Sequence, residues 1–328
     1  MQVEKTQFYT TNAEQILTNL LNYLPKDCKI VEPFVGKGDL IPFIEQITKD
    51  YEIYDIASNL CPSTDTLLNP PDYKGKYVLT NPPYMAKNKS KDKSIYNKFE
   101  LDDLYKIFIK TMIDRDVEGG ILIIPANFLM DEYTSKLRED FFSKYQILHI
   151  NYFTYQIFDD TSYSIIAFYF EKSNTYDKTI LDIYTKTDVK RKEVILNGRL
   201  FQDFYNKFNE IKPIVGRIVS NNVDKATNIK VYCLDNKLSK IRAEYDENVF
   251  VGISTDRVFF TMTQPKNRLL TIEEQKELVS KFNLLVNGWR EEYENLIFTT
   301  YRENNRKRIS FDLAYKILTG IIEEKFNV

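Results

Sequence analysis

Short apolar runs alternate with stretches of helical hydrophobic spacing over the first half of the chain. The apolar runs have the length of strands, and the helical stretches carry apolar residues three and four positions apart. The pattern predicts strands at residues 29–32, 52–55, 77–80, 119–125, 147–153 and 163–171, and helices at residues 12–24, 40–49, 101–115 and 131–144. This alternation is typical of an α/β fold, a mainly parallel sheet wrapped by helices.

The pattern changes beyond about residue 185, where apolar runs shorten and asparagines and lysines become frequent. Strands are expected at residues 249–253 and 258–260, and helices at residues 272–290 and 310–326. A chain of 328 residues is long enough for two domains. We therefore predict an amino-terminal domain of residues 1–185 and a smaller α+β domain of residues 186–328.

The tetrapeptide Asn81-Pro82-Pro83-Tyr84 directly follows the apolar run of residues 77–80. It therefore lies where a buried strand ends and a loop begins, which is where open α/β sheets bind their ligands. An amide and a carbonyl held rigid by two prolines can accept hydrogen bonds from an exocyclic amine, and the tyrosine ring can stack on a flat base. The alternative is a rigid turn without chemistry.

A second loop with an acid and two glycines, Glu32, Gly36 and Gly38, follows the first predicted strand. Glycines allow a sharp turn and a close approach of the backbone to a ligand. Because the acid precedes the glycines and no third glycine follows, a pyrophosphate is less favoured here than a positive or neutral group near Glu32. A sulfonium with an amino-acid tail fits this loop.

These motifs resemble those of the S-adenosylmethionine-dependent DNA adenine-N6 methyltransferases of the gamma motif order, which occur in restriction-modification systems. The resemblance covers about the first 180 residues. It implies a Rossmann-like class I methyltransferase fold, with a mainly parallel seven-stranded sheet, helices on both faces and an antiparallel last strand. It also implies S-adenosyl-L-methionine as cofactor and a carboxyl-terminal target-recognition domain.

The resemblance assigns cofactor-binding roles along the first 81 residues. An F-Y-T segment closes over the methionine part, although Thr11 stands where the family has proline, and Lys37 and Asp39 replace small residues in the glycine loop. Asp55, after the second strand, would receive the ribose hydroxyls. Asp65 would accept a hydrogen bond from the adenine amine, unless it is an ordinary turn acid. The implied residues are Phe8, Tyr9, Thr10, Glu32, Phe34, Gly36, Gly38, Asp55, Ile56, Asp65 and Asn81.

The resemblance also implies the catalytic residues. A flipped adenine would donate from its N6 amine to the Asn81 side chain and the Pro82 carbonyl, with Pro83 keeping the turn rigid. Tyr84 and Phe158 would sandwich the ring, and Phe153 is the second choice for the facing aromatic.

Charge indicates where DNA could bind, although the formal net charge of −2 argues mildly against a nonspecific polyanion binder. Residues 185–242 hold thirteen Lys or Arg against six Asp or Glu, an excess of seven positive charges. A lysine-rich segment follows the tetrapeptide, and we expect it to be disordered without DNA; a solvated loop is the alternative. The candidate DNA contacts are Lys87, Lys89, Lys91, Lys93, Lys266, Arg268, Arg306 and Arg308.

Several classes are disfavoured. Cys28, Cys61 and Cys233 form no C-x-x-C pair and His149 is the single histidine, so we expect no metal site and no disulfide. Cys61 precedes Pro62, which does not indicate a thiolate mechanism. No apolar run of membrane length and no signal pattern is present, so we expect a cytoplasmic protein.

The predicted partners are double-stranded DNA and a cognate restriction endonuclease, and the chain is expected to act as a monomer. Three other substrates of an amino-methyltransferase stay open: RNA adenine, DNA cytosine N4 and protein glutamine. An alternative from another class is a non-catalytic DNA-binding subunit with a methyltransferase fold.

Overall fold

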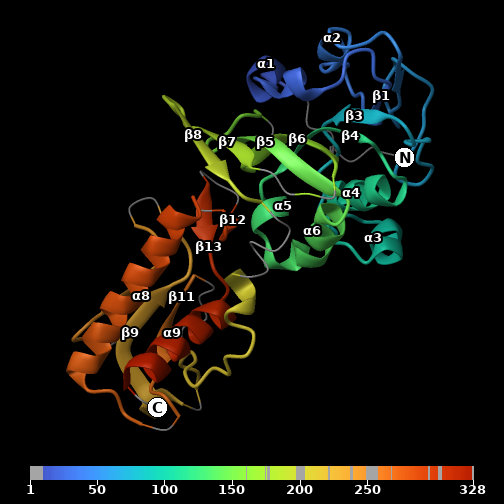
Figure 1. Cartoon of the computed structure of the whole chain (residues 1–328). Helices are drawn as coiled ribbons and strands as arrows, with labels where there is room; N and C mark the ends of the chain where they lie inside the picture. Colours follow the sequence, from blue (N-terminus) through green and yellow to red (C-terminus); the bar gives the residue numbers. More distant parts are fainter. Residues whose placement is uncertain are drawn as a thin grey trace. The chain divides into compact units, whose positions relative to one another are not determined.

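The computed structural model describes residues 10–159, 161–173, 175, 178–196, 204–220, 222–236, 239–248, 258–266, 268–294, 296–301 and 305–326. Phe8 and Tyr9, and the strand expected at residues 249–253, lie outside this part of the chain. The fold divides into two compact units (Figure 1). Unit 1 comprises Met1–Leu129, Tyr133–Leu200 and Arg302–Asn305, and unit 2 comprises Met130–Glu132, Phe201–Tyr301 and Arg306–Val328.

Unit 1 is built on one sheet, in which the described residues form eight strands in the order β2-β1-β3-β4-β6-β5-β7-β8. The pairs β1–β2, β1–β3, β3–β4 and β5–β7 are parallel, whereas β6 is antiparallel to β4 and β5, and β8 is antiparallel to β7. The strands are β1 Ile30–Glu32, β2 Tyr51–Ile53, β3 Tyr77–Thr80, β4 Gly119–Pro125, β5 Tyr145–Phe153, β6 Ile165–Lys172, β7 Thr179–Tyr184 and β8 Val189–Val194. The expected mainly parallel sheet with a reversed strand is confirmed, and β8 extends it past residue 185.

Helical segments of unit 1 lie on both faces of the sheet, as two neighbouring residues of β6 show. Phe168 packs against Phe128 and Phe141 on one face, and Tyr169 stacks on Tyr23 on the other. The segments are α1 Ala13–Ile16, η1 Leu20–Tyr23, α2 Ile41–Ile44, α3 Ser94–Phe99, α4 Leu104–Asp114, α5 Asn127–Met130, η2 Glu132–Thr134 and α6 Ser135–Phe142.

The helices of unit 1 differ in part from the sequence prediction. The helix expected at residues 12–24 is broken into α1 and η1, because Asn19 adopts a left-handed backbone conformation with φ 65°. The helix expected at residues 40–49 is only four residues long. The helices around residues 101–115 and 131–144 are present as α4 and α6, and α3 was not expected.

Unit 2 pairs a small antiparallel sheet of order β10-β9-β11 with two long helices (Figure 1). Its elements are η3 Val223–Lys225, β9 Ala226–Tyr232, β10 Arg242–Tyr245, β11 Phe259–Thr263, α8 Ile272–Glu292, the pair β12 Thr299–Tyr301 and β13 Arg306–Arg308, and α9 Phe311–Phe326. The Thr271 side chain accepts from the Glu274 backbone and the Glu274 side chain from the Thr271 backbone, so a capping box fixes the start of α8. The predicted helices at residues 272–290 and 310–326 are confirmed.

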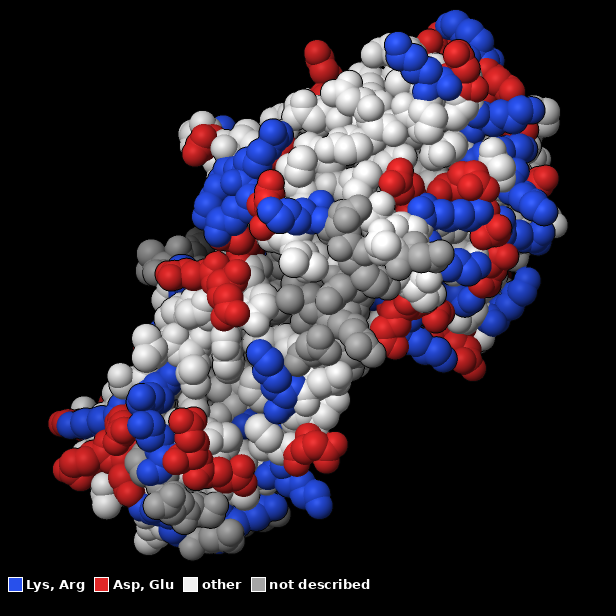
Figure 2. All heavy atoms as spheres, in the orientation of Figure 1, with Lys and Arg blue, Asp and Glu red and all other residues white. Residues whose placement is uncertain are grey.

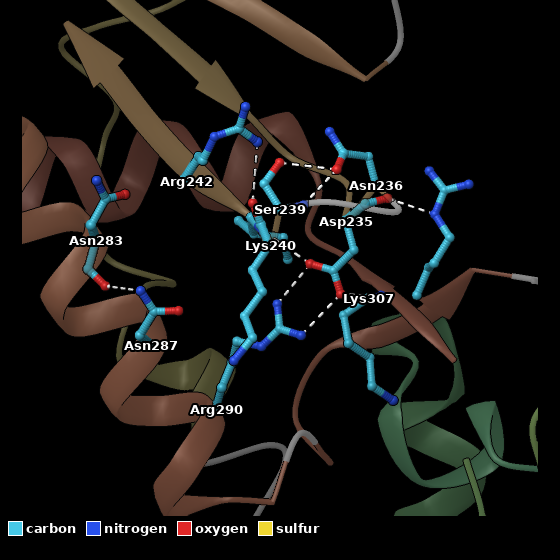
Figure 3. Close-up of polar contacts among 11 residues, drawn as sticks. Asp235, Asn236, Ser239, Lys240, Arg242, Asn283, Asn287, Arg290 and Lys307 are labelled. Atoms are coloured by element: carbon cyan, nitrogen blue, oxygen red, sulfur yellow. Dashed lines mark hydrogen bonds and ion pairs between the residues drawn. The ribbon is translucent and has the colours of Figure 1, made fainter. Parts of the chain in front are cut away.

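A buried ion pair joins α8 to the rest of unit 2 (Figure 3). Both terminal nitrogens of Arg290 donate to the Asp235 carboxylate, at 2.7 and 2.9 Å, and the backbone N–H groups of Lys307 and Ile241 also donate to it. Burial alone would raise the pKa of Asp235, but these hydrogen bonds hold it below its ordinary value. The carboxylate thus stays ionised and ties together α8, β13 and the segment between β9 and β10.

Candidate functional site

A cavity of about 270 Å³ lies beside the carboxyl ends of β1, β2 and β3. The glycine loop, the tetrapeptide and the segment after it, all far apart in sequence, share its wall. The lining includes Thr10, Phe34, Gly36, Asp55, Ile56, Asp65, Asn81, Pro83, Met85, Asp92 and Tyr96. Of the predicted cofactor-binding residues that the structure describes, Gly38 and Glu32 do not line this cavity.

The glycine loop has the backbone that its sequence indicates. Gly36 and Gly38 have φ angles of 53° and 86°, which glycine adopts without strain. A Cβ on Gly38 would lie 2.9 Å from the Leu60 Cδ1 atom and 3.1 Å from the Ile41 Cδ1 atom. Both atoms are ends of flexible side chains that can shift, so it is the positive φ that favours glycine at Gly38.

Asp55 fastens the loop after β2 to the glycine loop. Its Oδ2 atom accepts from the Gly36 N–H at 3.0 Å, and its Oδ1 atom accepts from the Ala57 and Ser58 N–H groups at 2.7 and 2.9 Å. The next residue, Ile56, lies half-exposed on the cavity wall. The carboxylate thus stands at the cavity with a fixed orientation, and a ribose contact stays a prediction.

Asp65 is a turn acid that also lines the cavity, and its contact with the adenine amine stays a prediction. Its Oδ1 atom accepts from the N–H groups of Leu67 and Leu68 at 3.1 and 3.2 Å, which is the hydrogen bonding of a turn acid. The same residue lines the cavity. The neighbouring Thr66 hydroxyl donates to the Pro33 carbonyl, which holds this turn against the glycine loop.

Glu32 is fully buried under the glycine loop. Its Oε1 atom accepts from the Thr80 hydroxyl at 2.6 Å and the Phe34 N–H at 2.9 Å, and its Oε2 atom has no partner among the described residues. Burial raises the pKa of Glu32 to about 8, against the opposing effect of these hydrogen bonds. At neutral pH the side chain is therefore mainly protonated.

The Asn81 amide is held from both ends. Its Nδ2 atom donates to the Thr10 hydroxyl at 3.1 Å, and its Oδ1 atom accepts from the Tyr84 hydroxyl, which also reaches the Ile123 carbonyl at 2.7 Å. Thr10 in turn donates from its N–H to Asp39 at 3.1 Å. These contacts hold the Asn81 side chain in place at both ends of its amide.

Tyr84 is only 4% exposed and does not line the cavity. Its ring packs edge-on against Tyr105 and Tyr163, with centroids 6.1 and 6.5 Å apart, and burial raises the pKa of Tyr84 well above its ordinary value. The hydroxyl therefore serves as a neutral hydrogen-bond donor to Asn81.

Two aromatics, Tyr105 and Tyr163, lie edge-on against Tyr84, and the sequence analysis assigned neither of them to the site. Phe158 and Phe153 are both buried, and Phe153 stacks on Tyr184 with ring centroids 4.8 Å apart. Tyr163, just before β6, is half-buried and makes the edge contact with Tyr84. The sequence signal for Tyr163 is its position as the first aromatic of the apolar run at residues 163–171.

The segment after the tetrapeptide is anchored on either side of its lysines, and their expected disorder without DNA stays a prediction. The Met85 N–H donates to Asp103 at 3.0 Å, the Met85 carbonyl accepts from the Tyr96 hydroxyl at 3.0 Å, and α3 forms part of the cavity wall. Burial raises the pKa of Asp103 to about 7. Sequence reasoning missed Asp103, which anchors this wall, because its contact with Met85 spans eighteen residues.

The candidate DNA contacts fall into two groups. Lys89, Lys91 and Lys93 are exposed and Lys87 is half-buried, all in unit 1 near the cavity. In unit 2, Lys266 and Arg268 line a second cavity, of about 520 Å³. Arg268 is paired with Glu274 and Arg306 donates to the Asp235 carbonyl, whereas Arg308 is exposed on β13.

The described residues hold no metal-ligating cluster, no helix of membrane-spanning character and no disulfide. No group of three or more metal-ligating side chains occurs there. No helix in that part of the chain is both long and apolar enough to span a membrane. Cys28, Cys61 and Cys233 are all free thiols.

The strand order of unit 1, with β6 inserted antiparallel between β4 and β5, defines a class I methyltransferase fold. The glycine loop and the tetrapeptide lie at the carboxyl edge of that sheet, where such open sheets bind ligands. Residues 4–158 match the Eco57I restriction-modification methylase family. A search of curated proteins found no match.

Solved structures of restriction-modification proteins are similar to this chain at low identity. The M protein of the type I restriction enzyme EcoKI is 14% identical, with 86% of this chain and 73% of that one covered and a TM-score of 0.43. A type I methyltransferase subunit from Streptococcus thermophilus is 14% identical, with 63% and 54% covered and a TM-score of 0.38. The type IIG endonuclease BpuSI is 13% identical, with 70% and 37% covered and a TM-score of 0.42. The chain thus spans about half of the Streptococcus subunit and about a third of BpuSI.

Proposed function

We propose that this chain is a site-specific DNA adenine-N6 methyltransferase that uses S-adenosyl-L-methionine, and that it modifies DNA in a restriction-modification system. The observation that carries the proposal is that the Asn81 amide, fixed by Thr10 and Tyr84, lies on the same cavity as the glycine loop. The match of residues 4–158 to a methylase family supports it.

The residues around the cavity fit the cofactor. Its volume of about 270 Å³ is near the lower end of common ligand pockets. Two carboxylates, Asp55 and Asp65, face it together with the exposed side of Ile56, so ribose hydroxyls, an amine and an apolar ring face can each find a partner. Glu32 does not line the cavity and supports the glycine loop from behind, through the hydrogen bond that its Oε1 atom accepts from the Phe34 N–H. When bound, S-adenosyl-L-methionine supplies the methyl group.

Asn81 and Pro82 would act on the target amine. The N6 hydrogens donate to the Asn81 Oδ1 atom and the Pro82 carbonyl, and these two acceptors stabilise the positive charge that develops on the nitrogen. The proton leaves after transfer, so no general base is required. The Tyr84 hydroxyl keeps the acceptor end of the Asn81 amide in place.

The base has to leave the duplex to reach Asn81. Extrusion costs a few kcal/mol, and stacking on an aromatic offsets about 1–3 kcal/mol per base. Tyr84 is 4% exposed, so its ring becomes available only when the surrounding loops open. Phe158 is the facing aromatic that the resemblance implies, and Tyr163 is a second candidate because its ring already lies against Tyr84.

Unit 2 would recognise the target sequence. Lys266 and Arg308 are its exposed cationic candidates, and Arg268 and Arg306 are held by Glu274 and Asp235. Lys266 and Arg268 line the cavity of about 520 Å³, and their side chains could contact purine edges or phosphates.

Transfer of labelled methyl to unmethylated duplex DNA, followed by nucleoside analysis, tests the proposal, and N6-methyladenine is the expected product. Methylcytosine, or label only in RNA or protein, would assign another amine substrate. Cofactor binding without any transfer would indicate a non-catalytic DNA-binding subunit.

The variant Asn81→Ala tests the catalytic role. Loss of one acceptor should lower turnover by about 10²–10³-fold, with cofactor affinity nearly unchanged. Asn88→Ala, an exposed asparagine in the same loop, is the matched control and should keep full activity. Equal loss of cofactor affinity and turnover in Asn81→Ala would contradict the assigned role.

A further inference from the structure

The chain that follows the tetrapeptide folds back on the residues just before α4. Ala86 and Asp103 form an antiparallel bridge. The Lys87 N–H donates to the Asp102 carbonyl at 2.7 Å. The backbone directly after the tetrapeptide is therefore tied to the start of α4.

The Asp103 side chain holds the peptide group that follows Tyr84. Its Oδ1 atom accepts from the Met85 N–H at 3.0 Å, and the Met85 carbonyl accepts from the Tyr96 hydroxyl on α3, also at 3.0 Å. The donating nitrogen belongs to the peptide bond between Tyr84 and Met85, so this hydrogen bond fixes the orientation of that peptide plane. The Tyr84 hydroxyl in turn donates to Asn81. Asp103 thus anchors the chain next to the ring that holds the Asn81 amide.

The rigid turn of the tetrapeptide transmits this anchor. Pro82 and Pro83 each have a locked φ angle, so two of the backbone rotations of the turn are removed. A stiff turn that is fixed beyond Tyr84 keeps its other end in place as well. That end carries the Asn81 amide and the Pro82 carbonyl, the two acceptors that the proposed reaction needs.

Asp103 differs from surface acids in its surroundings. Figure 2 shows acidic and basic side chains mixed over the surface of unit 1, whereas Asp103 is only 9% exposed. Burial raises the pKa of Asp103 to about 7. The charge of Lys106 opposes this shift of the pKa, and the charge of Asp102 adds to it. The N–H groups of Met85 and Tyr105 also oppose it.

The proton on Asp103 therefore changes how firmly the tetrapeptide is held. Tyr84, the titratable group on the tetrapeptide side, stays neutral, because burial and the charge of Asp103 raise the pKa of Tyr84 well above its ordinary value. Near neutral pH Asp103 is populated in both its ionised and its protonated form. A hydrogen bond to a carboxylate is about twice as strong as one to a neutral acceptor. The ionised form thus holds the Met85 N–H more firmly than the protonated form.

We propose that Asp103 is a positioning residue for methyl transfer: by holding the Met85 N–H, its side chain keeps the Asn81 amide and the Pro82 carbonyl where they receive the target amine. This inference rests on the proposed function. Asp103 itself needs no contact with the cofactor or the base. The rate of methyl transfer should fall as the pH drops below about 7, because protonation loosens the tetrapeptide. The competing role is purely structural, in which Asp103 only fastens the start of α4.

The single-turnover rate of methyl transfer to duplex DNA, at saturating cofactor and DNA and from about pH 5.5 to about pH 8.5, tests the inference. The wild-type rate should rise about tenfold, in a step centred near pH 7. D103N keeps an acceptor for the Met85 N–H but carries no charge. Its rate should lack the step and lie about tenfold below the wild type at the high-pH end, with cofactor and DNA affinities nearly unchanged.

Three further variants assign the step. D114N changes an exposed acid at the other end of α4, and this matched control should keep both the rate and the step of the wild type. D102N removes the exposed ion-pair partner of Lys106 and a charge that raises the pKa of Asp103, so its step should move to lower pH. E32Q removes the other buried carboxyl of the site that titrates in this range, and it should keep the step near pH 7.

The outcomes separate the possible failures. Absence of a step near pH 7 in both wild type and E32Q, or a D103N variant with the wild-type rate and step, overturns the role of Asp103. Weaker cofactor and DNA binding by D103N, with an unchanged rate at saturation, assigns the purely structural role instead. If D103N does not fold, the step in E32Q and its shift in D102N decide. Wild-type protein that transfers no methyl to duplex DNA at any pH overturns the proposed function, and the role of Asp103 with it.

Discussion

Glu32→Gln should remove a pH dependence of stability that the buried carboxyl imposes on unit 1. Burial raises the pKa of Glu32 from 4.5 to about 8. The folded state therefore binds the proton more tightly than the unfolded state. Stability is highest at pH values below the unfolded-state pKa of 4.5, and it falls as the pH rises towards the folded-state pKa of about 8. Glutamine keeps an acceptor for the Thr80 hydroxyl and the Phe34 N–H but does not titrate.

The magnitude follows from the two pKa values. Each unit of difference corresponds to about 1.36 kcal/mol, so the free energy of unfolding of the wild type, relative to Glu32→Gln, should fall by about 3 kcal/mol between about pH 5.5 and pH 9. Above this range the difference should be constant. Below about pH 4 the two proteins should differ little, because the wild-type carboxyl is then protonated in the unfolded state as well as in the folded state.

Urea unfolding at a series of pH values measures this effect. Far-ultraviolet circular dichroism follows both units, whereas the fluorescence of Trp289, the single tryptophan, follows unit 2. The pH-dependent difference should appear in the dichroism and not in the fluorescence.

Glu52→Gln on the adjacent strand β2 is the control. Burial alone would raise the pKa of Glu52, but hydrogen bonds from Lys76 and Tyr54 hold it below its ordinary value. The stability of wild type relative to this variant should therefore rise with pH through the acidic range. A difference for Glu32→Gln that stays constant within about 1 kcal/mol from pH 5.5 to pH 9 would refute the reasoning, since it would mean that the carboxyl is ionised in the fold.

Three further substitutions test the packing of the two units. Gly120 has φ 146° and a Cβ there would lie 2.0 Å from the Val78 carbonyl oxygen, so Gly120→Ala should cost more than about 4 kcal/mol and abolish soluble protein. Gly288→Ala in α8, where a Cβ meets open space, should instead increase the free energy of unfolding by about 1 kcal/mol. The urea midpoint should rise accordingly. Arg290→Met leaves the buried Asp235 carboxylate without its charge partner and should destabilise unit 2 by about 3–5 kcal/mol in urea unfolding.

The parts of the site that are local in sequence were predictable. The glycine loop and the tetrapeptide each directly follow an apolar run that predicts a strand. Their glycines and prolines predict turns, so both motifs are expected at the carboxyl ends of strands. Asp55 and Asp65 were found for the same reason, since each closes or follows a short predicted element. Gly36, Asp55, Asp65, Asn81 and Pro83 line one cavity, whereas Glu32, Gly38, Pro82 and Tyr84 do not.

The parts that depend on distant contacts could not be predicted. The orientation of Tyr84 depends on Tyr105, Ile123 and Tyr163, which lie far along the chain. β8 was missed because its sequence, Val-Lys-Arg-Lys-Glu-Val, is that of an exposed edge strand without an apolar face. The helix expected at residues 12–24 failed at Asn19, whose left-handed conformation hydrophobic spacing does not reveal.

Thr10 links the glycine loop, which would bind the cofactor, to the Asn81 amide, which would contact the target amine. Its N–H donates to Asp39 in the glycine loop, and its hydroxyl accepts from Asn81. A ligand that moves Thr10 therefore acts at once on the loop and on the amide. Any such coupling is reciprocal: if one ligand changes the affinity for the other by a given factor, the second changes the affinity for the first by the same factor. Thr10 therefore offers a direct route to cooperative binding of the proposed cofactor and the proposed target base.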